Sequence, residues 1–208
     1  MSRSHLVAAV SMAALLGAGA CSKPATTAAT DAAADAAATT TVAATAPATD
    51  TEANIKQAQD FVNAAGQAGL AEIETSKLAL AHSTNPDVKA FAQMMIDDHT
   101  KAGEALKAAA AAAALAPPSD TLDETHTRLV NTLSGDLAPD KTGDNFDANY
   151  MHMQVEAHND AVKLFDDYGK NGKVPQVQTF AEATLPTLQM HKSKAESVAD
   201  SASKVKPS

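Results

Sequence analysis

The sequence predicts an all-α protein, an antiparallel four-helix bundle with a long crossover that carries a short helix. Four long segments repeat apolar residues at the spacing of one helix face, whereas no stretch alternates apolar and polar residues for long enough to indicate a sheet. Aromatic residues make up only 3% of the 208 residues, and tryptophan is absent. The core must therefore consist mainly of Ala, Leu, Val and Met, which favours closely packed helices.

The first 20 residues have the features of an export signal. Arg3 supplies a positive charge, residues 6–16 form a short apolar run, and the small residues 17–20 precede Cys21. The run is too short to cross a membrane, which takes about 20 apolar residues. Cys21 is the only cysteine, so no intramolecular disulfide can form. We interpret residues 1–20 as a cleaved signal peptide.

The junction at Cys21 predicts a lipid attachment site. The stretch Ala18-Gly19-Ala20-Cys21 resembles the bacterial lipoprotein box, although that box usually has Leu where this chain has Ala18. Ser22 follows Cys21. In the lipoproteins that this junction resembles, a residue other than Asp directly after the cysteine is associated with the outer membrane. We therefore expect an outer-membrane lipoprotein of the bacterial cell envelope that faces the periplasm and contacts the membrane through its N-terminal lipid. The alternative is simple cleavage after Ala20, which leaves a free N-terminal cysteine.

Residues 21–52 are expected to form a disordered tether. After the cysteine they are mostly Ala, Thr, Asp and Pro, with too little apolar surface to offset the entropy cost of ordering. A flexible chain of this length would span roughly 30 Å.

The charge balance limits the partners. The chain has a net charge of −9, and loss of Arg3 with the signal leaves 15 Lys and Arg against 25 Asp and Glu, a net charge of −10. This balance argues against nucleic acid as a partner, whereas a protein partner stays open.

Residues 53–202 should form the bundle domain, followed by a C-terminal tail at 203–208. About 150 residues are enough for one sizeable core. The long helices are expected at 53–82, 86–115, 144–168 and 175–202, with a short helix at 119–135 in the crossover. Asn85 and Pro86 have the pattern of an N-cap and a first helical residue, and Pro186 should kink the last helix.

One polar residue lies on or beside the apolar face of each long helix. Glu72 lies 13 residues before the cap of the second helix and His99 lies 14 after it, so an antiparallel hairpin places them at nearly the same level. His158 and His191 lie 14 and 19 residues from the turn at Gly172, a difference of about 8 Å along the axis. The spacing predicts four converging side chains: Glu72, His99, His158 and His191.

Three imidazoles and a carboxylate suit one divalent transition metal such as Zn, Fe, Mn or Cu. Asp98 would then accept a hydrogen bond from an imidazole and fix its tautomer. The alternative is that the histidines are hydrogen-bonded core residues without a metal. Three other histidines are weaker candidates: His82 lies at a helix end, His126 on partly buried surface and His152 off the apolar stripe. The methionines are expected to fill core and surface.

Three segments carry a family resemblance: FAQMMIDDHTKAGEAL from Phe91, GDNFDANYM from Gly143, and FAEATLPTLQMHKSKAE from Phe180. They look like the bacterial envelope family called domain of unknown function 4142, over residues 59–198. That family is regarded as ferritin-like, is often exported and has no settled activity. The resemblance therefore implies a ferritin-like bundle with a long crossover.

The sequence departs from the pattern of di-iron ferritins, which use Glu-x-x-His on two helices. The residues three positions before the candidate histidines are Ile96, Val155 and Leu188, and Glu156 falls almost opposite His158 around its helix. A carboxylate-bridged di-iron centre is therefore not expected. A mononuclear histidine-rich site, or none, is expected instead.

Together these features predict an exported, lipid-anchored, ferritin-like envelope protein with a candidate metal site, serving a stress response or envelope maintenance. No nucleotide-binding loop, nucleophile motif or zinc-protease motif occurs, so no catalytic residue is assigned and a non-enzymatic role is favoured. The alternative function is a structural or protein-interaction module whose core histidines are only hydrogen-bonded. A histidine phosphotransfer bundle would need an exposed cytoplasmic histidine, which the export signal opposes.

Overall fold

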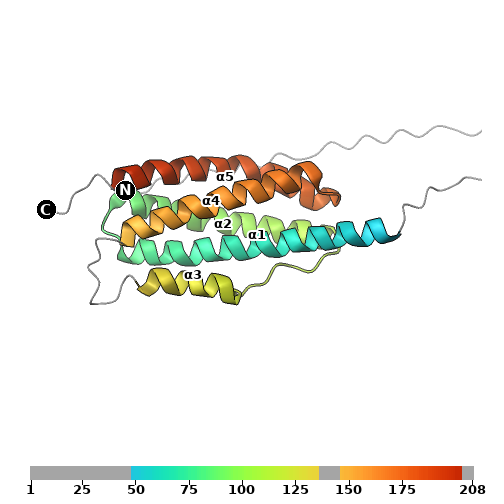
Figure 1. Cartoon of the computed structure of the whole chain (residues 1–208), viewed down its shortest axis with the longest axis horizontal. Helices are drawn as coiled ribbons and strands as arrows, with labels where there is room; N and C mark the ends of the chain where they lie inside the picture. The colour runs from blue at the N-terminus through green and yellow to red at the C-terminus, as the bar shows by residue number, and fades with distance from the viewer. Residues whose placement is uncertain (1–47, 136–145, 203–208) are drawn as a thin grey trace, which may run out of the picture. The chain divides into compact units, whose positions relative to one another are not determined.

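The computed structural model describes residues 48–135 and 146–202, which form five α-helices and no strand. The helices are α1 (Ala48–His82), α2 (Pro86–Ala112), α3 (Glu124–Gly135), α4 (Phe146–Asn171) and α5 (Pro175–Ala202) (Figure 1). The predicted all-α fold class is therefore confirmed for this part of the chain. None of these five helices is both long and apolar enough to cross a membrane.

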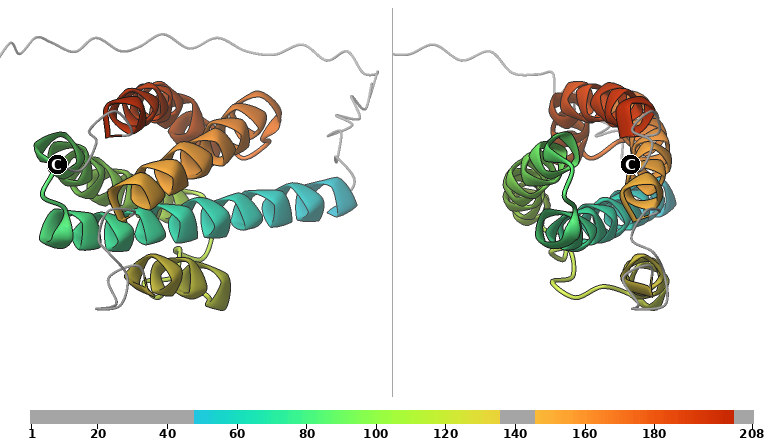
Figure 2. Two further views of the ribbon diagram at one scale, coloured as in Figure 1. Left: turned by 60° about the vertical axis from the view of Figure 1, so that its left-hand side comes forward. Right: turned by 90° about the vertical axis from the view of Figure 1, so that its left-hand side faces the viewer.

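The four long helices pack around one shared interior. α1 contacts α2 and α4, α5 also contacts α2 and α4, and α3 lies outside against α1 (Figure 2). One apolar cluster joins the end of α1, the start of α2, the start of α4 and the end of α5. Neighbouring long helices therefore run in opposite directions. Two antiparallel hairpins result, and residues 113–145 connect them.

Buried polar side chains divide the core of this bundle into two apolar clusters. The cluster near the α4–α5 turn includes Phe61 and Phe165, whose rings meet edge to face with centroids 5.0 Å apart. The cluster near the α1–α2 turn includes Phe91 and Met95. We call the buried side chains between them the polar layer, which consists of Glu72, Thr75, Ser76, His99, Gln154, His158 and His191.

The ends of α2 follow from local sequence. The Asn85 side chain caps the first turn by accepting a hydrogen bond from the Asp87 N–H at 2.9 Å, as the sequence predicted. The helix ends at Ala112, three residues before the expected end. Ala114 has a φ of 55°, which leaves helical geometry, and the Leu115 N–H closes the end by donating to the Ala110 carbonyl at 2.9 Å.

Other helix boundaries differ from the expected ones. α1 begins at Ala48, five residues before the expected start. α3 begins at Glu124 rather than at 119, because Asp123 provides the cap by accepting a hydrogen bond from the His126 N–H at 2.8 Å. α4 extends three residues past its expected end, and α5 has the expected bounds and continues through Pro186. The expected loop at 136–143 lies outside the described residues.

The chain after α2 is fastened along α1 by two glutamines. Gln59 donates to the Ala116 carbonyl at 3.1 Å and accepts from the Ala116 N–H at 2.9 Å. Gln67 makes a similar pair of backbone bonds two turns later, at 2.9 and 2.7 Å. Between them, a Cβ added to Gly66 would lie 2.4 Å from the Pro118 Cβ, so only glycine lets the connection approach this closely.

Candidate metal centre

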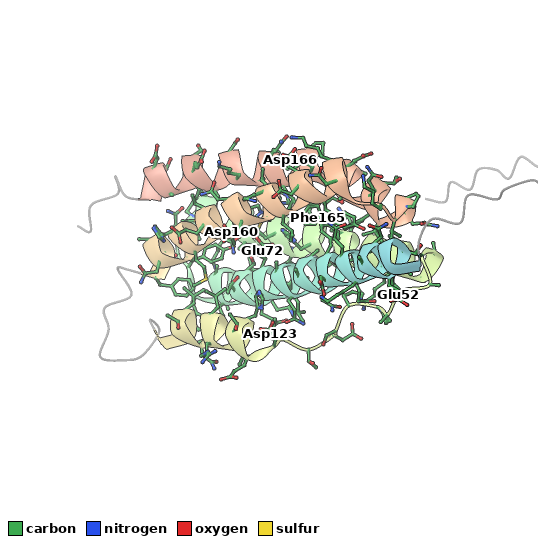
Figure 3. The ribbon with its side chains drawn as sticks, turned by 45° about the vertical axis from the view of Figure 1, so that its right-hand side comes forward. Glu52, Glu72, Asp123, Asp160, Phe165 and Asp166 are labelled. Atoms are coloured by element: carbon green, nitrogen blue, oxygen red, sulfur yellow. The ribbon has the colours of Figure 1, made fainter. Side chains whose placement is uncertain are left out.

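The structure brings the four predicted site residues together in the polar layer, one from each long helix. Glu72 comes from α1, His99 from α2, His158 from α4 and His191 from α5. Their exposed fractions are 5, 7, 0 and 1%. Figure 3 shows Glu72 in the second half of α1 and on its side toward the bundle interior, unlike Glu52 near the start of the same helix. The antiparallel hairpins thus place four polar groups at one level of an apolar core.

The distances within this group are short. One nitrogen from each of the three histidines lies within 4.8 Å of the other two, and the ring centroids are 5.4 to 5.7 Å apart. Glu72 joins two of the rings, with Oε2 3.1 Å from His99 Nε2 and Oε1 3.2 Å from His158 Nδ1. Neither pair of atoms is aligned for a hydrogen bond, so Glu72 Oε1 and His99 Nε2 each lack a hydrogen-bond partner.

Hydrogen bonds to the outer nitrogens fix the tautomers of two imidazoles. His158 Nδ1 donates to the Gln154 carbonyl at 2.9 Å, because a carbonyl oxygen can only accept. His191 Nε2 donates to Asp98 Oδ2 at 3.2 Å. In the neutral rings the other nitrogens, His158 Nε2 and His191 Nδ1, therefore carry lone pairs. Both are buried, and neither has a hydrogen-bond partner.

Asp98 accepts a hydrogen bond from an imidazole, and its role in supporting a metal ligand stays a prediction. It lies beside His99 in the chain but binds His191 on the neighbouring α5. Its side chain is 30% exposed and also contacts Lys101 at 3.2 Å, so its charge stays partly solvated. Desolvation would raise the pKa of the Asp98 carboxyl, but the hydrogen bonds from His191 and Lys101 outweigh it and lower that pKa.

Burial keeps the centre uncharged at neutral pH in the absence of a metal. Desolvation raises the pKa of Glu72 from 4.5 to about 8. Desolvation first, and then the two neighbouring imidazoles, lower the pKa of His99 to about 3. Desolvation also lowers the pKa of His158 to about 4, and it lowers the pKa of His191 in spite of Asp98. All three rings are thus in the neutral form that binds metals.

The group of atoms that could hold a metal ion consists of one nitrogen from each of the three histidines, and Glu72 lies beside it with Oε2 3.1 Å from His99 Nε2. Tetrahedral zinc with nitrogen ligands at 2.0–2.1 Å would separate those nitrogens by about 3.4 Å. The three histidine nitrogens, which lie within 4.8 Å of one another, would close in by about an ångström to reach this separation. Rotation of the side chains can supply a movement of that size.

Sequence reasoning missed four other buried polar residues near the centre. Ser76 and Tyr150 share a hydrogen bond of 2.8 Å between their hydroxyl groups, and Gln154 Nε2 donates to Thr75 Oγ1 at 3.3 Å. A signal was present, because Ser76 follows Glu72 by one helical turn, and Tyr150 and Gln154 precede His158 by two turns and one. Thr75, Ser76 and Gln154 thus join the polar layer to Tyr150, which belongs to the apolar cluster of Phe91.

The weaker candidates lie away from the centre. His82 is exposed at the end of α1, and His126 pairs with Asp123 at the start of α3. His152 and Glu156 are both exposed on α4, with closest atoms 3.8 Å apart. Met95 and Met151 are buried in the apolar core, as expected of filler residues. Cys21, the predicted signal peptide and most of the predicted tether lie outside the described residues.

The comparisons with known proteins identify a family. Neither the curated proteins nor the solved structures contain a match to the chain. A family model described as "Domain of unknown function (DUF4142)" matches residues 19–198, which is most of the chain and includes α1 to α4 in full and α5 as far as Val198. The chain therefore belongs to the DUF4142 family.

Proposed function

We propose that the protein is a ferritin-like four-helix bundle that binds one divalent transition metal at Glu72, His99, His158 and His191. The antiparallel hairpins and the long connection between α2 and α4 support the ferritin-like arrangement, in which the second and third long helices run in the same direction. Asp98 supports the site by orienting His191.

The observation that carries the proposal is a set of buried nitrogens without partners. His99 Nε2, His158 Nε2 and His191 Nδ1 come from three helices, and none of them has a hydrogen-bond partner. Unpaired buried polar atoms are rare because each costs about 1–3 kcal/mol. Three such atoms in one place, within reach of a buried carboxylate, are accounted for if all of them bind the same ion.

The ligand set favours a mononuclear centre. Glu156 is exposed and cannot reach the site, so α4 lacks the second carboxylate that a di-iron centre would use. Imidazole nitrogens suit Zn, Cu and Fe, and a carboxylate oxygen also accepts Mn. We infer a structural or sensing role rather than a catalytic one, because no nucleophile or general base outside the ligand set is assigned.

The cellular role that we propose is in the envelope. The export signal and the lipoprotein-like junction at Cys21 support an outer-membrane lipoprotein whose bundle faces the periplasm. A metal site in that position would serve envelope maintenance or a response to metal stress. The alternative is a structural or protein-interaction module with the same fold and no metal.

Thermal unfolding with and without metal separates these alternatives. The purified protein, freed of metal by chelation, is titrated at pH 7.5 with Zn, Mn, Fe(II) or Cu. Binding to the native state alone contributes about 2.7 kcal/mol at a hundredfold excess of metal over Kd, which raises Tm by roughly 5–10 °C. His191→Ala and the conservative His99→Gln should abolish this increase. His152→Ala, at an exposed histidine, is the matched control and should retain it.

The proposal fails if Tm does not change for any of the four metals. It also fails if His191→Ala, His99→Gln and His152→Ala all keep the increase. Either result would support the structural module, in which the core histidines stabilise the protein equally with and without metal.

A further inference from the structure

The four side chains of the candidate centre are shut off from solvent, whereas the residue that hydrogen-bonds to one of them is not. Glu72, His99, His158 and His191 expose between 0 and 7% of their surface. Asp98 accepts a hydrogen bond from His191 Nε2 at 3.2 Å, and 30% of its side chain is exposed. A metal ion needs a path to buried ligands. Asp98 is one side chain away from the centre and is in contact with water.

The two helix hairpins meet along two seams, and these seams differ in what covers them. The seam between α1 and α4 has α3 outside it, because α3 contacts both of these helices. Within the described ranges, no helix lies outside the seam between α2 and α5 (Figure 2). α2 and α5 belong to different hairpins, so no short turn ties one to the other. The α2–α5 seam is therefore the one that can open most easily.

A groove of about 490 Å³ follows the α2–α5 seam, and Asp98 lies in its wall. Small side chains make up much of the rest of the wall: Ala102, Ala105, Ala183, Thr184 and Thr187. An ion with about six water ligands takes up roughly 200 Å³, at about 30 Å³ for each water. The groove thus has room for a hydrated metal ion beside the Asp98 carboxylate.

The charges in the groove also suit the arrival of a cation. Asp98 and Lys101 are the charged residues of its wall, and Lys101 Nζ lies 3.2 Å from Asp98 Oδ1. The Lys101 side chain is 74% exposed, and exposed ion pairs of this kind are weak. Lys101 can therefore turn into water when a divalent cation takes its place at the carboxylate.

His191 separates Asp98 from the other imidazoles. Its Nε2 bonds to Asp98, and its ring centroid lies 5.4 Å from the centroids of both His99 and His158. Its Nδ1 is buried without a hydrogen-bond partner, so rotation of the ring breaks one hydrogen bond only. Pro186, five residues earlier, has no N–H to donate, so α5 lacks one backbone hydrogen bond just before His191.

We propose that metal ions enter and leave the centre through the α2–α5 seam, and that Asp98 binds the arriving ion before His191 does. The Asp98 carboxylate holds the ion in the groove, and the ring of His191 turns toward it and binds it through the lone pair of Nδ1. Return of the ring brings the ion to the remaining ligands. This inference rests on the proposed metal site and gives Asp98 a kinetic role besides that of orienting His191.

A cavity of about 280 Å³ between α1 and α2 is the competing entrance. Gly103 faces its empty space, since a Cβ added there would meet no atom within 4 Å. The acidic Asp120 in its wall pairs with Lys107 at 2.6 Å and not with a residue of the centre. Among the described residues, Asp98 is the partly exposed carboxylate that bonds to a ligand of the centre, which favours the groove.

Rates of zinc uptake by the metal-free protein test the route. Zn²⁺ is delivered from a weak chromophoric chelator in a stopped-flow instrument, and its release is followed after addition of excess strong chelator. Equilibrium competition with the chromophore gives Kd. Asp98→Asn keeps an oxygen that accepts from His191 but removes the charge, so uptake and release should both slow by roughly tenfold. If Asp98 only orients His191, uptake should be unchanged and release should be faster.

A matched pair of lysine variants tests the charge at the entrance. Lys101→Ala frees the Asp98 carboxylate and should speed uptake by about threefold. Lys77→Ala is the control, because Lys77 is also exposed and pairs with an acid three residues earlier, Glu74, on α1. This control should leave the uptake rate unchanged.

A second pair tests the groove itself. Ala183→Leu, at an exposed position in its wall, should slow uptake and release by about fivefold and leave Kd nearly unchanged, because it obstructs the path and not the site. Ala108→Leu, at an exposed position of α2 outside both the groove and the cavity, should change neither rate. Circular dichroism confirms that each variant is folded.

Unchanged uptake in both Asp98→Asn and Ala183→Leu would overturn the proposed route. So would slower uptake in Gly103→Leu but not in Ala183→Leu, which would assign the entrance to the cavity between α1 and α2. In either case zinc still binds at equilibrium, so the metal site stands and its entrance alone fails. A wild type that binds no zinc at equilibrium would overturn the zinc site and the entrance together.

Discussion

Replacing Glu72 by glutamine should stabilise the metal-free protein at neutral pH. The buried carboxyl has its pKa raised from 4.5 to about 8, so it is protonated in the folded protein and ionised in the unfolded chain between these values. Each pH unit above the ordinary pKa costs about 1.4 kcal/mol of folding stability, which amounts to about 3 kcal/mol at pH 7. Glutamine has nearly the same shape and no charge to remove.

The sign of the effect sets its pH dependence. Wild-type stability should be lost as pH rises from 4.5 through about 8, while Glu72→Gln should lack this loss. The two proteins should therefore be equally stable near pH 4.5 and should differ most above pH 8. Both should lose stability below pH 6.5, because His99 and His158 have lowered pKa values and stay neutral in the fold while they become charged in the unfolded chain.

A bound metal should reverse the comparison. The ion needs the ionised carboxylate, so at saturating metal the wild type should gain stability and Glu72→Gln should gain less. Urea unfolding at pH 4.5, 6, 7 and 8, with and without metal, measures both effects. The reasoning about the buried carboxyl is refuted if the metal-free variant is less stable than the wild type at pH 8. It is also refuted if the difference between them does not change with pH.

Two further predictions concern other parts of the chain. Ala114→Gly should raise stability by about 0.5–1 kcal/mol, because glycine adopts the φ of 55° without strain. The control Ala108→Gly, at an exposed helical position, should lower stability by about 1 kcal/mol. Equal effects of the two substitutions in urea unfolding would contradict this account. Cys21→Ala should move the protein from the membrane fraction to the soluble periplasmic fraction of a bacterial host, and a wild type that is already soluble would rule out the lipid anchor.

Counting residues from helix ends predicted that the four side chains of the candidate site lie close together, as the structure shows. Glu72 and His99 were expected at one level, and two of their side-chain atoms lie 3.1 Å apart. The expected offset of about 8 Å between His158 and His191 was too large, since their ring centroids lie 5.4 Å apart. The count of residues along the two helices started at Gly172, so it included the loop between Asn171 and Pro175 as if that loop were helical. His158 lies 13 residues before the end of α4, and His191 lies 16 after the start of α5.

Other features of the site depend on packing that the pattern does not contain. The sequence indicated Asp98 as a supporting carboxylate but not its partner, because a residue that flanks an apolar stripe can face either neighbouring helix. Which nitrogen of each imidazole points inward depends on single contacts, such as the bond from His158 to the Gln154 carbonyl. The cavity was also missed, because Gly103 and the alanines near it read equally well as tight packing. Side-chain positions were needed to show the empty space.

The polar layer also determines how the helices align lengthwise. A helix that shifted by one turn, about 5.4 Å, would move its polar side chain from this layer to the level of one of the two apolar clusters. Such a shift would place an imidazole or the Glu72 carboxyl against hydrocarbon, at a cost of roughly 2–7 kcal/mol for each unpaired group. The observed alignment instead keeps these polar groups beside one another at one level of the core. A sequence of low side-chain variety can thus fold to a single register, because a few polar residues at one height exclude the shifted ones.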